Sequence, residues 1–263
     1  MQDRTKLAKK PADRYFEFQA VMGLTKHMGG LKATDVLAGL CRIGEGKFIL
    51  DVGCGPGRTA CYLAKVYGCR VMGIDLSESM VELARDRAAK EGVADKVTFC
   101  TADAMKLPFE EATFDAVIGE SVLAFIDDKP RTLSELKRVT KEDGSIGFNE
   151  CAWIKMPPQQ LIQYISDVLG AAFLTPDGWR DLWVAAGLKE VSARSYKVRI
   201  LEQWRSELKE LEINEMFGAW RRFIGLLFRS PECRRWARKT LSMPRNIFAL
   251  FKYFGYGIYV GRK

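Results

Sequence analysis

The residues best suited to chemistry in this chain follow its first apolar strand. Residues 48–52 read Phe-Ile-Leu-Asp-Val, and a turn with three glycines comes directly after them. Glycine accepts a positive φ and leaves no Cβ between the backbone and a ligand. A glycine-rich turn between a strand and a helix is where open α/β sheets bind nucleotide-like cofactors. The predicted cofactor-binding positions of this turn are Asp51, Gly53, Cys54, Gly55 and Gly57.

The spacing of the glycines argues against a dinucleotide site. The dinucleotide pattern G-x-G-x-x-G would need a glycine at position 58, which is Arg58. The observed pattern is D-x-G-x-G-x-G, with Asp51 inside the strand. It resembles motif I of the class I S-adenosylmethionine-dependent methyltransferases, and this resemblance implies S-adenosyl-L-methionine as the cofactor.

A second strand, residues 71–75, ends in another acidic residue. Asp75 lies 18 residues after Gly57, close to the spacing of about 20 residues at which α/β cofactor folds place a carboxylate on ribose hydroxyls. A carboxylate accepts two hydroxyl protons at once, which suits a vicinal diol. A helix is predicted to begin here with Ser77 as its N-cap. Leu76 and Met80, at the start of this helix, are also predicted cofactor-binding residues.

The third and fourth strands extend the resemblance. Residues 97–100 form the third strand, and Asp103 and Ala104 follow it. In the methyltransferases an Asp here bonds the adenine amino group, and the backbone amide of the next residue meets the ring. Residues 107–117 match the family pattern LPF…FDxV. The resemblance covers about residues 45–196 and is nearest to the ubiquinone/menaquinone and sarcosine/dimethylglycine types of small-molecule methyltransferase.

Strands and helices alternate through the rest of this region. This alternation predicts an α/β fold that is Rossmann-like, with a seven-stranded, mostly parallel sheet and an antiparallel last strand. The later elements are expected at 114–120 (strand), 129–140 (helix), 145–153 (strand), 177–186 (helix), 191–198 (strand) and 255–260 (strand).

We expect one methyltransferase domain over residues 1–263. Its predicted parts are an N-terminal helical cap (1–44), a core (45–198), a helical insertion or lid before the last strand (199–245) and the final strand (246–263). Gly30 in the cap would let the chain pass close to the methionine end of the cofactor; an ordinary loop between helices is the alternative. The insertion mixes aromatic and basic side chains, as in a lid over an apolar or anionic substrate or in a membrane-surface contact. Packing of these aromatics on the sheet is the other reading.

Two residues are candidate catalytic groups. Glu120 ends the fourth strand, where it would point toward the methyl donor or the acceptor, so it is a predicted cofactor-binding residue as well. His27 is the only histidine and therefore the only imidazole that could act as a base near neutral pH. Methyl transfer from a sulfonium is an in-line displacement, so the protein mainly aligns the reactants and excludes water. Glu150, Trp153 and Trp179 are expected to line the same pocket.

No metal site is predicted. The adjacent acids Asp127 and Asp128 are the one weak candidate pair, and a helix N-cap is the preferred reading for them. The sequence also has no C-x-x-C motif that would suggest a zinc ribbon.

The charge distribution leaves several partners open. The chain has 41 Lys and Arg and 33 Asp and Glu, a net charge of +8, and residues 151–263 alone carry +9. A basic surface suits an acidic substrate, a nucleic acid or an anionic membrane, or is simply a solvated helix face. Residues 119–122 read Gly-Glu-Ser-Val instead of the Asn/Asp-Pro-Pro-Tyr-like motif of enzymes that methylate nucleic-acid amino groups, so nucleic acid is disfavoured. We therefore expect a small-molecule or lipid-like acceptor, with peripheral membrane contact and oligomerisation left open.

The alternatives to this function are an RNA or protein methyltransferase and a catalytically silent cofactor-binding subunit. The intact motif residues disfavour the silent subunit. Seven cysteines, an odd number, fall largely on predicted core elements. This predicts a reducing, cytoplasmic location, as does the lack of an apolar N-terminal signal or of an apolar run of about 18 residues.

Overall fold

The part of the chain that the structure describes contains the whole predicted sheet. The structure is a computed structural model that describes residues 27–198 and 250–263, together with the separate positions 221, 224, 225, 228, 234 and 238. The predicted cap up to residue 26 and nearly all of the predicted lid, 199–245, lie outside the described residues.

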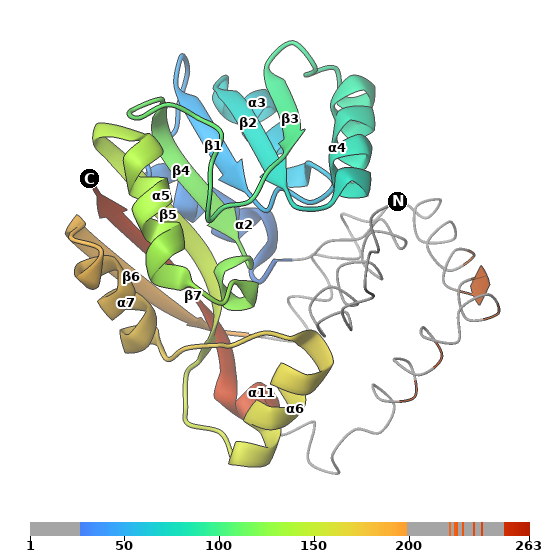
Figure 1. Cartoon of the computed structure of the whole chain (residues 1–263), viewed down its shortest axis with the longest axis vertical. Helices are drawn as coiled ribbons and strands as arrows, with labels where there is room; N and C mark the ends of the chain where they lie inside the picture. Colours follow the sequence, from blue (N-terminus) through green and yellow to red (C-terminus); the bar gives the residue numbers. More distant parts are fainter. Residues whose placement is uncertain are drawn as a thin grey trace, which may run out of the picture.

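Seven strands form a single sheet in the order β3-β2-β1-β4-β5-β7-β6 (Figure 1). The β1–β2, β1–β4, β2–β3 and β4–β5 pairs are parallel, and β7 runs antiparallel to both β5 and β6. The predicted fold class is thus confirmed, including the antiparallel last strand. The strands are β1 (Phe48–Val52), β2 (Arg70–Asp75), β3 (Val97–Thr101), β4 (Phe114–Glu120), β5 (Thr140–Trp153), β6 (Lys189–Lys197) and β7 (Phe254–Arg262).

Helices cover both faces of the sheet. One core cluster packs β1 and β4 residues such as Ile49 and Ile118 against α2, α3 and α4, and the other packs Leu50 and Val117 against α5 and α7. In Figure 1, α5 and α7 lie in front of the sheet, while α2 and α3 lie behind it. Because neighbouring strand residues point to opposite faces, Asp51 lies on the same face as Ile49, toward α2 and α3. The helices are α2 (Gly30–Leu40), α3 (Arg58–Tyr67), α4 (Glu78–Glu91), the 3-10 helix η1 (Leu123–Phe125), α5 (Lys129–Val139), α6 (Gln159–Leu169), α7 (Pro176–Ala185) and α11 (Leu250–Tyr253).

Local capping explains where the helices begin. The side chains of Ser77 and Asp128 accept hydrogen bonds from the backbone N–H groups of Met80 and Arg131, respectively. Each satisfies one of the N–H groups that a helix start leaves without an intrahelical partner. Both predicted N-caps are therefore confirmed.

Three expectations about the elements were wrong or incomplete. The fifth strand begins at Thr140 instead of residue 145. Thr140 pairs with Phe114 and Ser145 pairs with Ala116, so the residues between Thr140 and Ser145 form a bulge within the strand, in which Asp143 has φ +61°. The predicted final-strand segment, 246–263, includes helix α11 before β7. Helix α6 was missed, although Leu161, Ile165 and Val168 mark its buried face at helical spacing.

The six cysteines that the structure describes are free thiols, and five of them are buried. This agrees with the expectation that they lie on core elements. Within the described ranges, no helix has both the length and the apolar composition to cross a membrane.

Candidate active site

A cavity of about 860 Å³ opens at the carboxyl ends of β1, β2 and β4. Parallel strands bring their carboxyl ends to one edge of a sheet, which is where open α/β folds bind ligands. Eleven of the predicted site residues line this cavity: His27, Asp51, Gly53, Cys54, Gly55, Asp75, Leu76, Met80, Asp103, Ala104 and Glu120. Two others, Gly30 and Gly57, do not occur among the described lining residues.

The glycines of the turn have different tasks. Gly53 has φ +67°, and a Cβ there would lie 2.5 Å from Val122 Cγ2, so the loop after β4 can approach only a glycine. A Cβ on Gly57 would lie 2.8 Å from the Cβ of Ala84, away from the cavity. Gly57 therefore allows α3 to pack against α4, and its predicted contact with the cofactor is not supported.

The Asp75 carboxylate braces the glycine turn from the end of β2. Its Oδ2 accepts the N–H of Gly55 at 3.0 Å, and its Oδ1 accepts the N–H of Ser77 at 2.9 Å. Burial raises the pKa of Asp75, while these backbone bonds oppose that rise. A carboxylate has about four acceptor positions, so Asp75 keeps acceptor capacity for a diol. Leu76 beside it is 73% exposed and lines the cavity.

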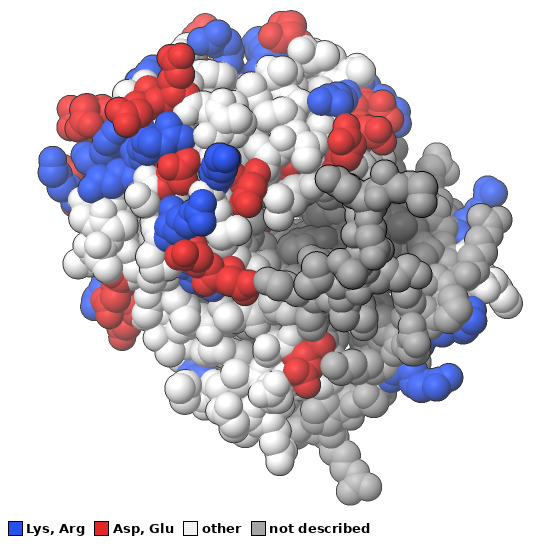
Figure 2. Space-filling model, in the orientation of Figure 1, with Lys and Arg blue, Asp and Glu red and all other residues white. Residues whose placement is uncertain are grey.

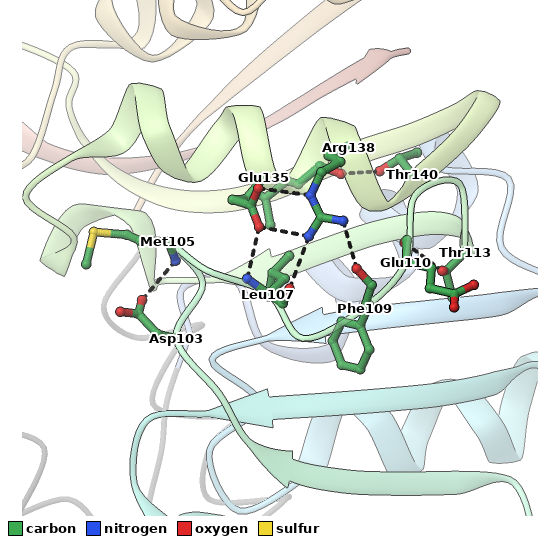
Figure 3. A network of polar contacts seen from close by, with 10 residues as sticks. Asp103, Met105, Leu107, Phe109, Glu110, Thr113, Glu135, Arg138 and Thr140 are labelled. Atoms are coloured by element: carbon green, nitrogen blue, oxygen red, sulfur yellow. Dashed lines mark hydrogen bonds and ion pairs between the residues drawn. The ribbon is translucent and has the colours of Figure 1, made fainter.

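The loop carrying Asp103 is fixed by a pair of residues on α5 (Figure 3). Arg138 donates to the carbonyl oxygens of Phe109 at 2.7 Å and Leu107 at 3.1 Å. Glu135 accepts the N–H of Leu107 at 3.0 Å and pairs with Arg138 at 2.9 Å. This pair was not predicted, although an acid and a base three residues apart on a predicted helix are a visible signal.

Glu120 and His27 are brought together as members of one polar cluster. The Glu120 carboxylate accepts hydrogen bonds from Thr59 Oγ1 at 2.7 Å and from Thr34 Oγ1 at 3.2 Å. Asn149 Nδ2 lies 3.4 Å from it and His27 Nδ1 lies 3.5 Å from it. The Glu120 side chain is only 4% exposed. Glu120 and His27 were predicted as site residues. The other three, Thr34, Thr59 and Asn149, were not, because only the fold brings α2, α3 and β5 next to the end of β4.

Asp51 shows that the cavity suits a cationic ligand. Its side chain is 2% exposed, and its Oδ2 has no hydrogen-bond partner in the protein. Burial raises the pKa of Asp51, and the nearby carboxylates of Glu120 and Asp75 raise it further. A cation beside these groups would relieve both effects. S-adenosylmethionine carries an ammonium and a sulfonium group, so the residues present fit the cofactor that the sequence resemblance implies.

Glu150 lines the cavity as predicted but is directed at the protein backbone. Its carboxylate is fully buried and accepts N–H groups of the loop that follows β4. Burial raises the pKa of Glu150 to about 7. Neither Trp153 nor Trp179 is among the lining residues, so these two predictions were wrong. Trp179 is fully buried under the sheet and donates to the carbonyl of Cys151.

Part of the cavity lining is apolar and comes from η1, α6, β7 and the segment after α6, beside Ser166 and Asp167 of α6. Phe125, Leu169, Phe173 and Phe254 form this part, and the rings of Phe173 and Phe254 lie 5.4 Å apart. The missed helix α6 contributes Leu169. One cavity thus joins a polar end, suited to a cationic cofactor, to an aromatic end.

Charges on the outer surface are mixed. Figure 2 shows lysine, arginine and acidic side chains interspersed over the described part of one face, without a large field of one sign. A single-signed positive field is the usual footprint of nucleic-acid binding, and the described part of this face does not present one.

Comparisons with known proteins agree with this geometry. Residues 50–148 match a family model described as a methyltransferase domain. An uncharacterized protein of Haemophilus influenzae is 32% identical over 189 residues, which cover 70% of this chain and 75% of that protein. The 27-O-demethylrifamycin SV methyltransferase of Amycolatopsis mediterranei is 36% identical over 126 residues, 48% of this chain and 46% of that enzyme.

A solved structure shares the fold over nearly the whole chain. The cyclase SpnF superposes with a TM-score of 0.75 at 22% identity and covers 97% of both chains. At this identity the likeness concerns the fold alone. The glycine turn, the acids that follow β2 and β3, and the sequence matches together decide the family. The chain belongs to the class I S-adenosylmethionine-dependent methyltransferases, and it spans about half the length of the named small-molecule enzyme that it matches.

Proposed function

We propose that this chain transfers the methyl group of S-adenosylmethionine to an apolar, small or lipid-like acceptor by in-line displacement. The observation that carries the proposal is the continuity of one cavity from the glycine turn to the aromatic wall. A methyl donor at one end and an acceptor at the other would meet inside it, screened from water.

Four residues receive cofactor roles in this proposal. Asp75 binds the ribose hydroxyls, and Asp103 binds the adenine amino group. Asp51 faces the cationic methionine end, and Gly53 lets the backbone approach it. The support is that all four line the cavity and that Asp51 Oδ2 is buried without a partner.

Glu120 and His27 act on the acceptor side. S-adenosylmethionine, when bound, supplies a methyl group already activated by its sulfonium. The protein aligns the attacking atom with that methyl carbon, and the electron pair of the breaking C–S bond stays on sulfur. When the attacking atom carries a proton, His27 would accept it at Nε2, which then gives up its 3.2 Å contact with Thr34 Oγ1, and Glu120, 3.5 Å from Nδ1, would stabilise the imidazolium that forms.

The aromatic wall defines the acceptor further. Phe125, Phe173 and Phe254 offer flat apolar surface, which binds rings or hydrocarbon chains better than highly polar molecules.

Two measurements test this function. Calorimetry should show binding of S-adenosylhomocysteine and no binding of NAD. Asp75→Ala should weaken the binding of S-adenosylhomocysteine by about 1.5–3 kcal/mol, the usual contribution of a hydrogen bond to a charged group. Glu120→Gln and His27→Ala should instead reduce turnover and leave cofactor affinity within a few-fold.

The acceptor is found by incubating the protein with methyl-labelled cofactor and a cell extract, followed by mass spectrometry. Label in a small apolar compound supports the proposal. Label in RNA or protein would contradict the proposed small-molecule acceptor and show that the chain methylates a macromolecule. Label that stays on the cofactor in every extract would indicate a silent binding subunit or another reaction on this fold.

A further inference from the structure

The loop between β4 and η1 directs successive backbone N–H groups toward one point. Ser121 has a left-handed φ of +58°, and Val122 follows with φ −121° and ψ −41°. After this turn the N–H groups of Val122, Leu123 and Ala124 are directed to the same side, which creates a concave site for an anion. Here the anion is a side chain of the protein itself.

Glu150, near the end of β5, occupies this concave site. Its Oε1 accepts the N–H groups of Val122 at 2.9 Å and Leu123 at 2.7 Å, and its Oε2 accepts that of Ala124 at 3.3 Å. The residue is 0% exposed. A buried carboxylate is costly unless hydrogen bonds and charges compensate it, so the carboxylate and the loop depend on each other.

Lys129 at the start of α5 closes the other end of the same loop. Its ammonium donates to the carbonyl oxygen of Ile126 at 2.8 Å, and it is attracted by the charge of Glu150. Tyr259 and Cys151 also lie within the electrostatic range of Glu150. The loop 121–126 is therefore fixed from β5 and from α5.

The same loop also faces the cavity. Val122, Ala124 and Phe125 line it, and Val122 also contacts the glycine turn at Gly53. A shift of the loop would consequently move the wall at the methyl donor and the wall at the acceptor together.

We propose that Glu150 is a positioning residue of the methyl-transfer site, whose carboxylate fixes the loop 121–126 against the glycine turn. The inference rests on the proposed function for what the loop accomplishes. Its test is chosen to be independent of turnover, so that failure of methyl transfer and failure of this inference give different results.

The first measurement is amide hydrogen exchange in Glu150→Gln at pH 8, where the wild-type carboxylate is ionised. The amide group of glutamine turns a donor toward the backbone N–H groups. The amides of residues 122–124 should exchange about 10- to 100-fold faster, as expected for the loss of bonds to a charged acceptor, while those of β1 and β4 stay protected. The matched control is Asp115→Asn, which removes a carboxylate that accepts the N–H of Phe48 at the opposite end of β4; it should leave residues 122–124 unchanged.

The second measurement is affinity for S-adenosylhomocysteine. Glu150→Gln should bind it about tenfold more weakly, equivalent to ~1.4 kcal/mol, with Asp115→Asn within about twofold of the wild type. Glu150→Asp keeps two oxygens on a shorter side chain and should lie between the wild type and Glu150→Gln. If Glu150→Gln does not fold, Glu150→Asp provides the same test, because its shorter side chain cannot reach all three N–H groups in the same geometry.

Two results would overturn the inference. One is wild-type exchange at residues 122–124 in a folded Glu150→Gln variant or, if that variant does not fold, in Glu150→Asp. The other is an equal loss of protection across all core strands with unchanged affinity for S-adenosylhomocysteine, which would make Glu150 a determinant of global stability only.

Discussion

Replacement of Gly53 by alanine tests whether the glycine turn is required by the loop that it faces. The substitution adds one methyl group in a backbone with φ +67°, at 2.5 Å from Val122 Cγ2 and 3.0 Å from Val122 Cβ. A left-handed alanine costs about 1–2 kcal/mol, and overpacking of this kind costs about 1–3 kcal/mol more. We expect Gly53→Ala to lower the free energy of unfolding by about 2–5 kcal/mol.

Gly92 provides a matched control. It ends α4 with φ +70°, but a Cβ there would meet nothing within 4 Å. Gly92→Ala therefore carries the backbone cost alone, about 1–2 kcal/mol. The difference between the two variants isolates the contact with Val122. Equilibrium urea unfolding of both proteins gives this difference, provided that the transitions remain two-state with the same m-value.

A double variant sharpens the test. Val122→Ala removes the methyl that the new Cβ would strike, so Gly53→Ala with Val122→Ala should be more stable than the sum of the single effects by about 1 kcal/mol or more. Calorimetry should also show weaker S-adenosylhomocysteine binding by Gly53→Ala, because Gly53 lines the cavity, and unchanged binding by Gly92→Ala. Equal destabilisation by the two single variants together with strict additivity would refute the reasoning.

Three further outcomes are expected. Arg138→Met leaves the carbonyl groups of Leu107 and Phe109 without their donor, so S-adenosylhomocysteine should bind about 3- to 10-fold more weakly, and unchanged calorimetry would separate this pair from the cofactor site. Between pH 4.5, the usual pKa of a glutamate, and about pH 7, the raised pKa of Glu150, the folded protein keeps the Glu150 proton and the unfolded protein loses it. The free energy of unfolding should thus fall by up to about 3 kcal/mol as the pH rises through that window. In Glu150→Gln, urea unfolding measured over the same pH range should not show this decrease. Gly57→Ala should destabilise the fold by about 2 kcal/mol or more through its clash with α4, yet bind cofactor normally once folded; a loss of affinity in folded protein would restore Gly57 to the cofactor site.

Local features of the sequence were sufficient for most of the fold. The strands at Phe48–Val52 and Phe114–Glu120 and the helix Arg58–Tyr67 lie where the apolar patterns place them. Burial in a parallel sheet requires near-continuous apolar runs, and a covering helix requires an apolar face, so both leave short-range signals. The acids at strand ends were equally visible, because parallel strands present their carboxyl ends at one edge.

The tertiary structure alone decided how those residues are used. Glu120 was identifiable as a strand end, but its contacts with Thr34 and Thr59 join residues 86 and 61 positions away. Glu150 read as a lining side chain, yet it is bonded to backbone groups 26–28 residues earlier. Gly57 looked equivalent to Gly53 until the packing of α4 distinguished them. The physical reason is that periodicity and turn chemistry act over a few residues, whereas the partner of a buried carboxylate or of a glycine depends on which distant elements the sheet brings together.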